Sequence, residues 1–406
     1  MGDFARSADP AVQAELDRLH LLSPGADVLG LDRIRRLLDA LGNPQERLPP
    51  VFHVAGTNGK GSTCAFLRAG LEAAGHQVHV FTSPHLVRFN ERIRIAGKLV
   101  TDPELADLLR EVREASGDIG PSFFEATSAT AFLAFSRNPA DACVIEVGLG
   151  GRLDATNVIE TPLVCGIASV ARDHEQFLGS DLAGIAAEKA GIARAEFPLV
   201  TLAQPRMAEQ AIARVAAEAG AALLLEGRDW NVDPSLVPVM PGAWQLRNAN
   251  LAWQMLLAQE MLPVTIEQFR EGLAAATWPA RFQRLADGPL ANGRETWVDG
   301  AHNPDAAEAL AGLLADREPM HMVLGILANK DAERIVELLA PRAASLSFVP
   351  VPDHAHHDPA ELAAKFGGRA AASLQEALAD LPSPRLIVGS LYLAGEALSL
   401  NAEFPD

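Results

Sequence analysis

The stretch His53-Val54-Ala55-Gly56-Thr57-Asn58-Gly59-Lys60-Gly61-Ser62 indicates its chemistry more directly than any other part of this sequence. The apolar pair before it, Val51-Phe52, is typical of a short buried strand, and residues 63–67 after it are typical of the first turns of a helix. Glycines let the backbone turn its N–H groups inward, and a helix start adds partial positive charge. With the ammonium group of Lys60 and the hydroxyl group of Ser62, the stretch predicts a loop that holds a chain of phosphates and a metal ion.

This loop is a variant of the common nucleotide-binding pattern. That pattern has a glycine, four residues of any type, and then Gly-Lys-Ser or Gly-Lys-Thr. Here Val54 stands where the first glycine is expected, and Gly61 separates Lys60 from Ser62. The alternative interpretation of the stretch is a glycine-rich turn with an exposed lysine.

Length and charge indicate a class of protein. The chain has 406 residues, which predicts two or three domains, and we expect two. Hydrophobic residues make up 49% and charged residues 21%, as in a globular enzyme with a large core. The net charge of −18 disfavours nucleic acid as a partner, because phosphate backbones require clustered Lys and Arg. Small anionic substrates remain possible, since a local cationic pocket can gather them.

Cysteine usage and the N-terminus indicate a compartment. The three cysteines, Cys64, Cys143 and Cys165, are widely separated among apolar residues, which suggests neither disulfides nor a zinc site. The first residues contain no apolar signal core, and no apolar run is long enough to span a membrane. We therefore expect a cytoplasmic protein with no membrane partner, and we expect a monomer.

Three further predicted strands end in polar side chains. Ser83 follows an alternating stretch at 77–81, Glu146 ends an apolar run, and His174 follows the apolar run 163–170. Ligands of open parallel sheets bind off the carboxyl ends of strands, so these side chains are candidate magnesium ligands. The imidazole would also suit manganese. The plainer interpretations are a Ser-Pro turn, a salt bridge from Glu146 to an arginine, and a histidine without a functional role.

A cluster of turn-forming residues at 287–293 predicts the domain boundary, with domains at 1–288 and 289–406. After it, apolar runs near 296–298, 321–327, 348–349 and 386–390 predict a smaller α/β domain of about four strands. From the residues alone, Lys189 is typical of an exposed ion-pair lysine, and Phe124 is typical of a core aromatic.

Taken together and in order, these motifs resemble those of the folylpolyglutamate synthase and dihydrofolate synthase family, within the Mur-ligase-like group. The resemblance covers nearly the whole chain. It rests on residues 53–62, on Thr82-Ser83-Pro84-His85-Leu86, and on Asn90-Glu91-Arg92-Ile93. It rests equally on residues 146–157, Asp173-His174, Glu188-Lys189-Ala190-Gly191 and Asp299-Gly300-Ala301-His302-Asn303-Pro304. It implies a parallel-sheet domain with the phosphate loop and a Rossmann-like C-terminal domain that binds glutamate.

The resemblance also implies roles for individual residues. The metal ligands would be Ser83, Glu146 and His174. The residues that take part in catalysis would be Lys60, Lys189 and His302, and Lys189 would be carbamylated. Ser390 would lie near the glutamate substrate. ATP would be held by Thr57, Asn58, Gly59, Lys60, Gly61, Ser62, Asn248, Arg281 and Asp299, with Asn250 as an alternative to Asn248. The pterin pocket would be bordered by Leu29, Gly30, Phe124, Asp154 and Ala155. One departure is residues 352–357, where an arginine is expected and the chain has Pro-Asp-His-Ala-His-His.

The implied reaction is ATP-dependent. The γ-phosphoryl group passes to the carboxylate of dihydropteroate or of a reduced folate, and the amino group of L-glutamate attacks the acyl phosphate. One rival is a sister ligase acting on a UDP-sugar peptide; it would normally carry an additional N-terminal domain, for which the about fifty residues before the loop leave no room. The other rival is a non-catalytic nucleotide switch, which would not explain the strand-end ligands or the second domain.

Overall fold

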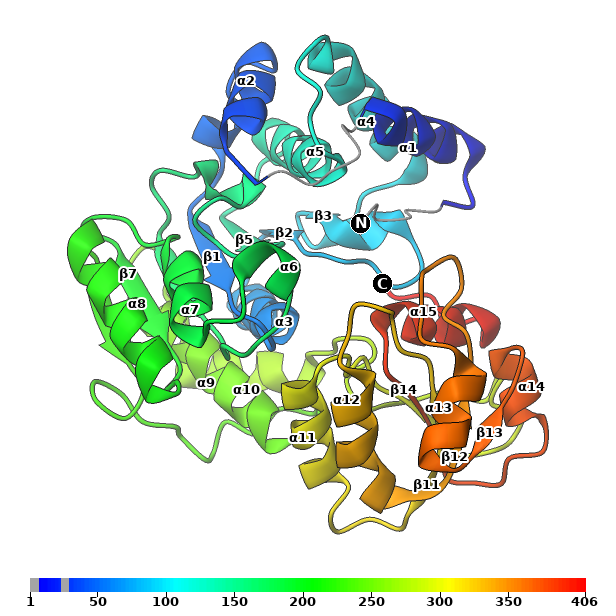
Figure 1. Ribbon diagram of the computed structural model, residues 1–406. Helices are drawn as coiled ribbons and strands as arrows, with labels where there is room; N and C mark the ends of the chain where they lie inside the picture. The colour runs from blue at the N-terminus through cyan, green and yellow to red at the C-terminus, as the bar shows by residue number, and fades with distance from the viewer. Residues whose placement is uncertain (1–6, 23–28) are drawn as a thin grey trace. The chain divides into compact units, whose positions relative to one another are not determined.

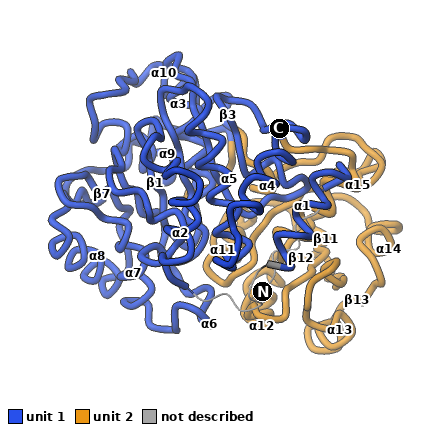
Figure 2. The backbone as a smooth tube through the Cα atoms, turned by 90° about the horizontal axis from the view of Figure 1, so that it is seen from above, with its two compact units in different colours: residues 1–239, 245–276, 406 blue, residues 240–244, 277–405 orange. Residues whose placement is uncertain are grey.

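The computed structural model describes residues 7–22 and 29–406 (Figure 1). It divides into two compact units (Figure 2). Unit 1 comprises Met1–Val239, Gln245–Ala276 and Asp406, and unit 2 comprises Met240–Trp244 and Thr277–Pro405. Each unit has its own sheet with helices packed against it, which confirms the predicted α/β class and the expectation of two domains.

Unit 1 contains an eight-stranded sheet in the order β4-β3-β2-β5-β1-β6-β7-β8. The six strands from β2 to β8 in this order are parallel, and the short strands β3 and β4 add an antiparallel edge. Strand β1 is central and buried at every residue. The strands are β1 Val51–Ala55, β2 Val78–Phe81, β3 Ile93–Ile95, β4 Lys98–Leu99, β5 Ala142–Glu146, β6 Val164–Ile167, β7 Pro198–Thr201 and β8 Ala222–Leu225.

The helices of this part of the chain are α1 Pro10–Leu22, α2 Asp32–Ala40, α3 Lys60–Ala73, α4 Asp102–Ser116, α5 Phe123–Arg137, α6 Glu175–Leu178, α7 Leu182–Ala190, α8 Arg206–Ala219, α9 Ala243–Leu257 and α10 Ile266–Ala275. Four of them, α1, α2, α4 and α5, pack together (Figure 1) in one apolar cluster that reaches the sheet at Val51, Phe81 and Ile145. A second cluster joins α7 and α8 to β6 and β7. From the sequence we also expect residues 11 to about 41 to be helical, with a break at Ser23-Pro24-Gly25. The structure has the two helices α1 and α2 in this range, and the expected break lies outside the described residues.

Unit 2 contains a six-stranded sheet in the order β13-β12-β11-β14-β10-β9, in which only the pairing of β9 with β10 is antiparallel. Four of the strands are those expected, and two two-residue strands extend the sheet at its edges. The strands are β9 Gln283–Arg284, β10 Thr296–Val298, β11 Met320–Leu324, β12 Ala343–Phe348, β13 Arg369–Ala370 and β14 Arg385–Val388. The helices are α11 Pro304–Leu313, α12 Ala332–Leu339, α13 Pro359–Phe366, α14 Leu374–Ala379 and α15 Leu391–Leu400.

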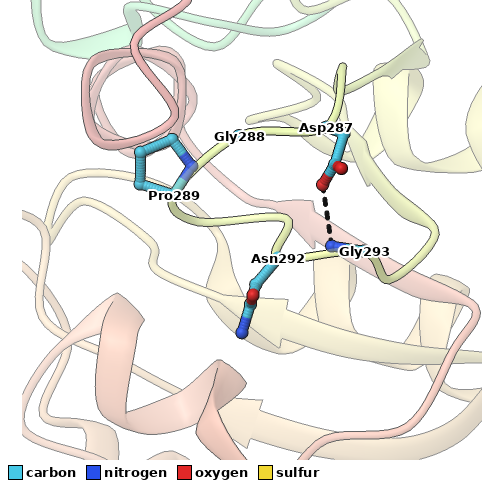
Figure 3. A pocket seen from close by; sticks show the side chains of 5 residues that line it. All are labelled: Asp287, Gly288, Pro289, Asn292 and Gly293. Atoms are coloured by element: carbon cyan, nitrogen blue, oxygen red, sulfur yellow. Dashed lines mark hydrogen bonds between the residues drawn. The ribbon is translucent and has the colours of Figure 1, made fainter.

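The chain enters unit 2 at Thr277, about a dozen residues before the boundary expected at residues 288 and 289. Strand β9 pairs with β10, and Phe282 is buried in the core of unit 2. The turn-forming residues instead build a surface loop of unit 2, where Asp287 accepts a hydrogen bond from Gly293 N at 2.8 Å (Figure 3). Asn401 Oδ1 holds this loop by accepting from two of its backbone N–H groups.

None of the helices in the described residues has the length and apolar character that crossing a membrane requires.

Candidate functional site

The phosphate loop connects β1 to α3 in the predicted order of strand, glycine turn and helix. Gly56 has φ +152° and Gly59 has φ +89°, backbone values that side chains rarely allow. Thr57 N donates to Ser169 O at 2.7 Å, and the Thr57 hydroxyl group donates to Ala171 O at 2.9 Å. The loop is therefore fastened to the segment that follows β6, the strand next to β1.

Two side chains contact this loop: Lys60, the first residue of α3, and Asn248, from α9. Lys60 Nζ donates to Thr57 O at 3.2 Å, so the ammonium group folds back over the loop. A Cβ atom on Gly59 would lie 2.5 Å from Asn248 Oδ1, which shows that the Asn248 side chain packs directly against the glycine. Asn250 instead bonds the backbone of Asp233 at both its amide oxygen and its amide nitrogen. Of the two asparagines, Asn248 is thus the one that contacts the loop.

Two of the predicted metal ligands lie in contact. Strand β5 lies between β2 and β1, so the carboxyl ends of the three strands are adjacent. Ser83, after β2, donates its backbone N–H to Glu146 Oε2, at the end of β5, over 3.3 Å. Glu146 is 4% exposed, and its charge and the opposing charge of Lys60 both act on the nearby Cys64 thiol, whose pKa is raised mainly by burial. The carboxylate therefore lies near the phosphate loop.

His174 follows β6 and precedes the short helix α6. Its side chain is exposed, its backbone has φ +53°, and its N–H donates to Asp173 Oδ1 at 2.7 Å. Among residues 7–22 and 29–406, no three His, Cys, Asp or Glu side chains form a group that could hold a metal. The predicted ligand set has only two side chains of those types, because its third member is a serine.

The donor set fits a polyphosphate and a divalent cation. The glycine cradle excludes any side chain at Gly59, Lys60 supplies a cation, and Ser83 and Glu146 offer hard oxygen ligands.

Lys189 is a buried lysine, so the interpretation of it as an exposed ion-pair residue is wrong. It lies in the last turn of α7 with 4% exposure, and its Nζ donates to Gly56 O at 2.9 Å. Burial, and then the charge of Lys60, lower the pKa of Lys189 to about 7. The charges of Asp173 and Asp154 oppose this shift. An amine of this pKa is substantially neutral and nucleophilic near neutral pH.

Of the predicted pterin residues, Phe124, Asp154 and Ala155 lie at the loop after β5. The ring of Phe124 covers Gly148 so closely that a Cβ atom there would lie 2.3 Å from its Cζ. Asp154 is buried, which raises its pKa, and Ala155 begins the turn that Asp154 caps. Leu29 and Gly30 precede α2. In α2, Arg33 Nε forms an ion pair with Glu125 Oε2 at 3.0 Å, and Glu125 follows Phe124 in the sequence.

Arg281, Asp299 and His302 gather in unit 2 at the carboxyl end of β10. Asp299 accepts backbone N–H groups from Phe282 and Ala301, each at 2.8 Å. Burial raises the pKa of Asp299, and the guanidinium group of Arg281 opposes that shift. His302 Nδ1 bonds Gly300 O at 2.8 Å, and Ser390 caps α15 after the neighbouring strand β14.

Three residues near these loops were assigned no individual role from the sequence. Gly148 makes room for Phe124, while His53 and Thr156 bond each other at 2.8 Å beside Asp154. The available signal was His53 itself, since a polar side chain inside an apolar strand requires a buried partner.

Comparisons with known proteins agree with this arrangement. The family model for the Mur ligase, glutamate ligase domain matches residues 280–386. A folylpolyglutamate synthase from Lacticaseibacillus casei is 37% identical, over 89% of this chain and 92% of that protein. The structure of Escherichia coli FolC in complex with DHPP and ADP has a TM-score of 0.87 at 33% identity and covers 97% of this chain and 98% of that one.

A bifunctional folylpolyglutamate synthase/dihydrofolate synthase with Mn, AMPPNP and L-glutamate bound has a TM-score of 0.85 at 33% identity, over 96% of this chain and 97% of that one.

Proposed function

Because this chain belongs to the folylpolyglutamate synthase and dihydrofolate synthase family, we propose that the site around Lys60 activates a pteroate or folate carboxylate with ATP. The protein is an ATP-dependent ligase that joins L-glutamate to dihydropteroate, to the glutamate tail of a reduced folate, or to both. Its cofactor is a divalent metal ion, magnesium or manganese. The relatives favour this function over ligation to a UDP-sugar peptide and over a non-catalytic nucleotide switch.

The contacts of unit 1 support a role in phosphoryl transfer. We assign the ATP phosphates to residues 57–62 and Asn248, because the loop's glycine geometry, Lys60 and Asn248 converge there. We assign the metal ion to Ser83, Glu146 and His174. Bound there, the ion would neutralise charge on the phosphate oxygens. Lys60 adds a fixed positive charge over the same loop, where charge spreads over the transferred group.

The contacts of Lys189 support a carbamate at this site. Its amine is buried against Gly56 O and is held close to neutral. A neutral amine adds carbon dioxide through a new N–C bond and releases one proton to solvent, so the product is a carbamate anion. We propose that this anion replaces a lysine cation beside the phosphate loop and supports metal binding.

In the second step of the proposed reaction, the amino group of L-glutamate attacks the acyl phosphate formed in the first step. We propose that Phe124, Asp154, Ala155, Leu29 and Gly30 hold the pterin, and that His302 and Ser390 face glutamate. We also propose that Arg281 and Asp299, which lie together in unit 2, bind ATP. The protein needs to position the amine, stabilise the developing oxyanion and exclude water.

The observation that carries this proposal is the loop itself, with Lys60 folded back over it and Asn248 seated on Gly59. The test is to incubate purified protein with ATP, magnesium and L-glutamate, adding dihydropteroate to one tube and a reduced folate to another. Release of phosphate and a glutamylated product in at least one tube are expected. ATP hydrolysis without glutamylated product in both tubes would contradict the proposal.

We also propose that the enzyme acts as a monomer in the cytoplasm without nucleic acid. The net charge of −18 and three buried free cysteines support this. Sedimentation at assay concentration would test the monomer, and a dimer would contradict it.

A further inference from the structure

Three buried side chains link the central strand of unit 1 to the proposed pterin pocket. His53 Nε2 lies 2.8 Å from Thr156 Oγ1, and Thr156 Oγ1 lies 2.5 Å from Asp154 Oδ1. Their exposures are 1%, 0% and 3%. Since none of the three reaches solvent, each polar atom depends on a partner within the protein.

The hydrogen bonds among His53, Thr156 and Asp154 all donate toward the Asp154 carboxylate. Asp154 also accepts the backbone N–H of Thr156 at 2.9 Å on Oδ1 and that of Leu149 at 2.8 Å on Oδ2. Both Asp154 oxygens therefore act as acceptors, and the Thr156 hydroxyl group donates its proton to Oδ1. The threonine oxygen must then accept from His53, which places the histidine proton on Nε2.

The charge state of His53 agrees with this direction. Burial, and then the charge of Arg194, lower the pKa of His53 to about 3. The ring is therefore neutral at working pH and has one N–H to donate. Because this N–H is directed at Thr156, the rotation of the threonine hydroxyl group is fixed as well.

Resting on the proposed function, in which Asp154 borders the pterin, we propose that His53 and Thr156 are positioning residues that orient the Asp154 carboxylate toward that ring. Thr156 and Leu149 fix the two oxygens, and His53 fixes the hydroxyl group. His53 lies on β1, three residues before Gly56 of the phosphate loop. One strand thus supports both the phosphate loop and the group that orients the acceptor substrate.

The test compares variants that keep or remove each hydrogen-bonding group. Thr156→Val removes the hydroxyl group at constant shape, and we expect the KM for dihydropteroate or reduced folate to rise at least about tenfold, because two buried polar partners lose their bond. The KM for ATP should change less than about threefold. Thr156→Ser restores the hydroxyl group and should restore the KM for the folate substrate.

For the histidine, His53→Gln keeps an N–H at the same reach and should resemble wild type, whereas His53→Leu should resemble Thr156→Val. The matched control is His79→Leu. His79 is equally buried on β2, but it bonds Asn138 O and Ala96 N instead of the Asp154 loop. Its loss should lower the melting temperature without changing the ratio of the two KM values.

Equal effects on both KM values in Thr156→Val, or the same ratio change in His79→Leu, would overturn the proposal. Should the threonine and leucine variants fail to fold, nitrogen NMR of histidine-labelled wild type reads the tautomer directly. A proton on His53 Nε2 supports the proposal, and a proton on Nδ1 alone overturns it. Ligase activity of the wild type tests the proposed function separately.

Discussion

A single residue, Gly59, limits what can occupy the phosphate loop. Its φ of +89° already disfavours a side chain, and Asn248 leaves no room for one. We predict that Gly59→Ala raises the KM for ATP at least about tenfold, since the left-handed backbone alone costs about 1–2 kcal/mol and the methyl group must also displace Asn248. Steady-state kinetics with varied ATP would measure this.

Gly75→Ala is the matched control for this substitution. Gly75 has φ +91°, so the backbone strain is similar, but nothing lies within 4 Å of its missing Cβ atom. The control should lose stability while its KM for ATP stays near the wild-type value. If both variants raise that KM equally, the contact with Asn248 has no role in nucleotide binding.

The second prediction concerns Lys189, whose pKa is lowered to about 7. Only the neutral amine adds carbon dioxide, so the carbamate should be present above about pH 7 and be lost as pH falls through that value. Carbon-13 NMR of enzyme equilibrated with labelled bicarbonate would detect it. Lys189→Gln should remove the signal and reduce kcat by roughly 10- to 100-fold. The exposed Lys98→Gln should keep both. A signal that persists in Lys189→Gln would show that another amine is modified.

At the scale of elements, helix α9 contains two asparagines with different contacts: Asn248 contacts the phosphate loop, and Asn250 bonds the protein backbone. We predict that Asn248→Ala raises the KM for ATP about 3- to 10-fold. By contrast, Asn250→Ala should lower the free energy of unfolding by about 1–3 kcal/mol and leave that KM unchanged, because its amide bonds only the backbone of Asp233 and Leu246. Kinetics and urea unfolding of both variants provide the measurement. Reversed effects would assign the nucleotide contact to Asn250.

These same elements show how far sequence reasoning reaches. The strand, glycine turn and helix around Lys60 follow from local chemistry, and so does the contact between Ser83 and Glu146, because parallel strands bring their carboxyl ends together. The burial of Lys189 does not follow. Its helix has small residues on several sides, and only the packing of α7 against residues 151 and 56 determines which face is covered. Likewise, only the fold shows that His53 and Thr156 meet, 103 residues apart.

At the scale of the whole molecule, the boundary between the units depended on a pairing that local signals could not indicate. Turn-forming residues at 287–293 are typical of a linker, yet a surface loop has the same composition. Strand β9 is only two residues long, so no periodicity marks it before its pairing with β10 is known. The larger division into two α/β units was still predictable, because each unit repeats buried strands followed by helices.

The position of that boundary leads to the last prediction. A fragment of residues 277–405 retains Phe282, which stacks on Trp297 at 4.5 Å beneath the guanidinium group of Arg317, whereas a fragment of residues 289–405 lacks it and β9. Removing a buried aromatic of this kind costs about 3–5 kcal/mol, so the shorter fragment should unfold at lower urea concentration or fail to fold. Fragments 1–276 and 1–288 are the control, and their unfolding free energies should agree, since residues 277–288 belong to unit 2. Circular dichroism during urea titration would decide the matter: equal midpoints for the two C-terminal fragments would return the boundary to residue 288.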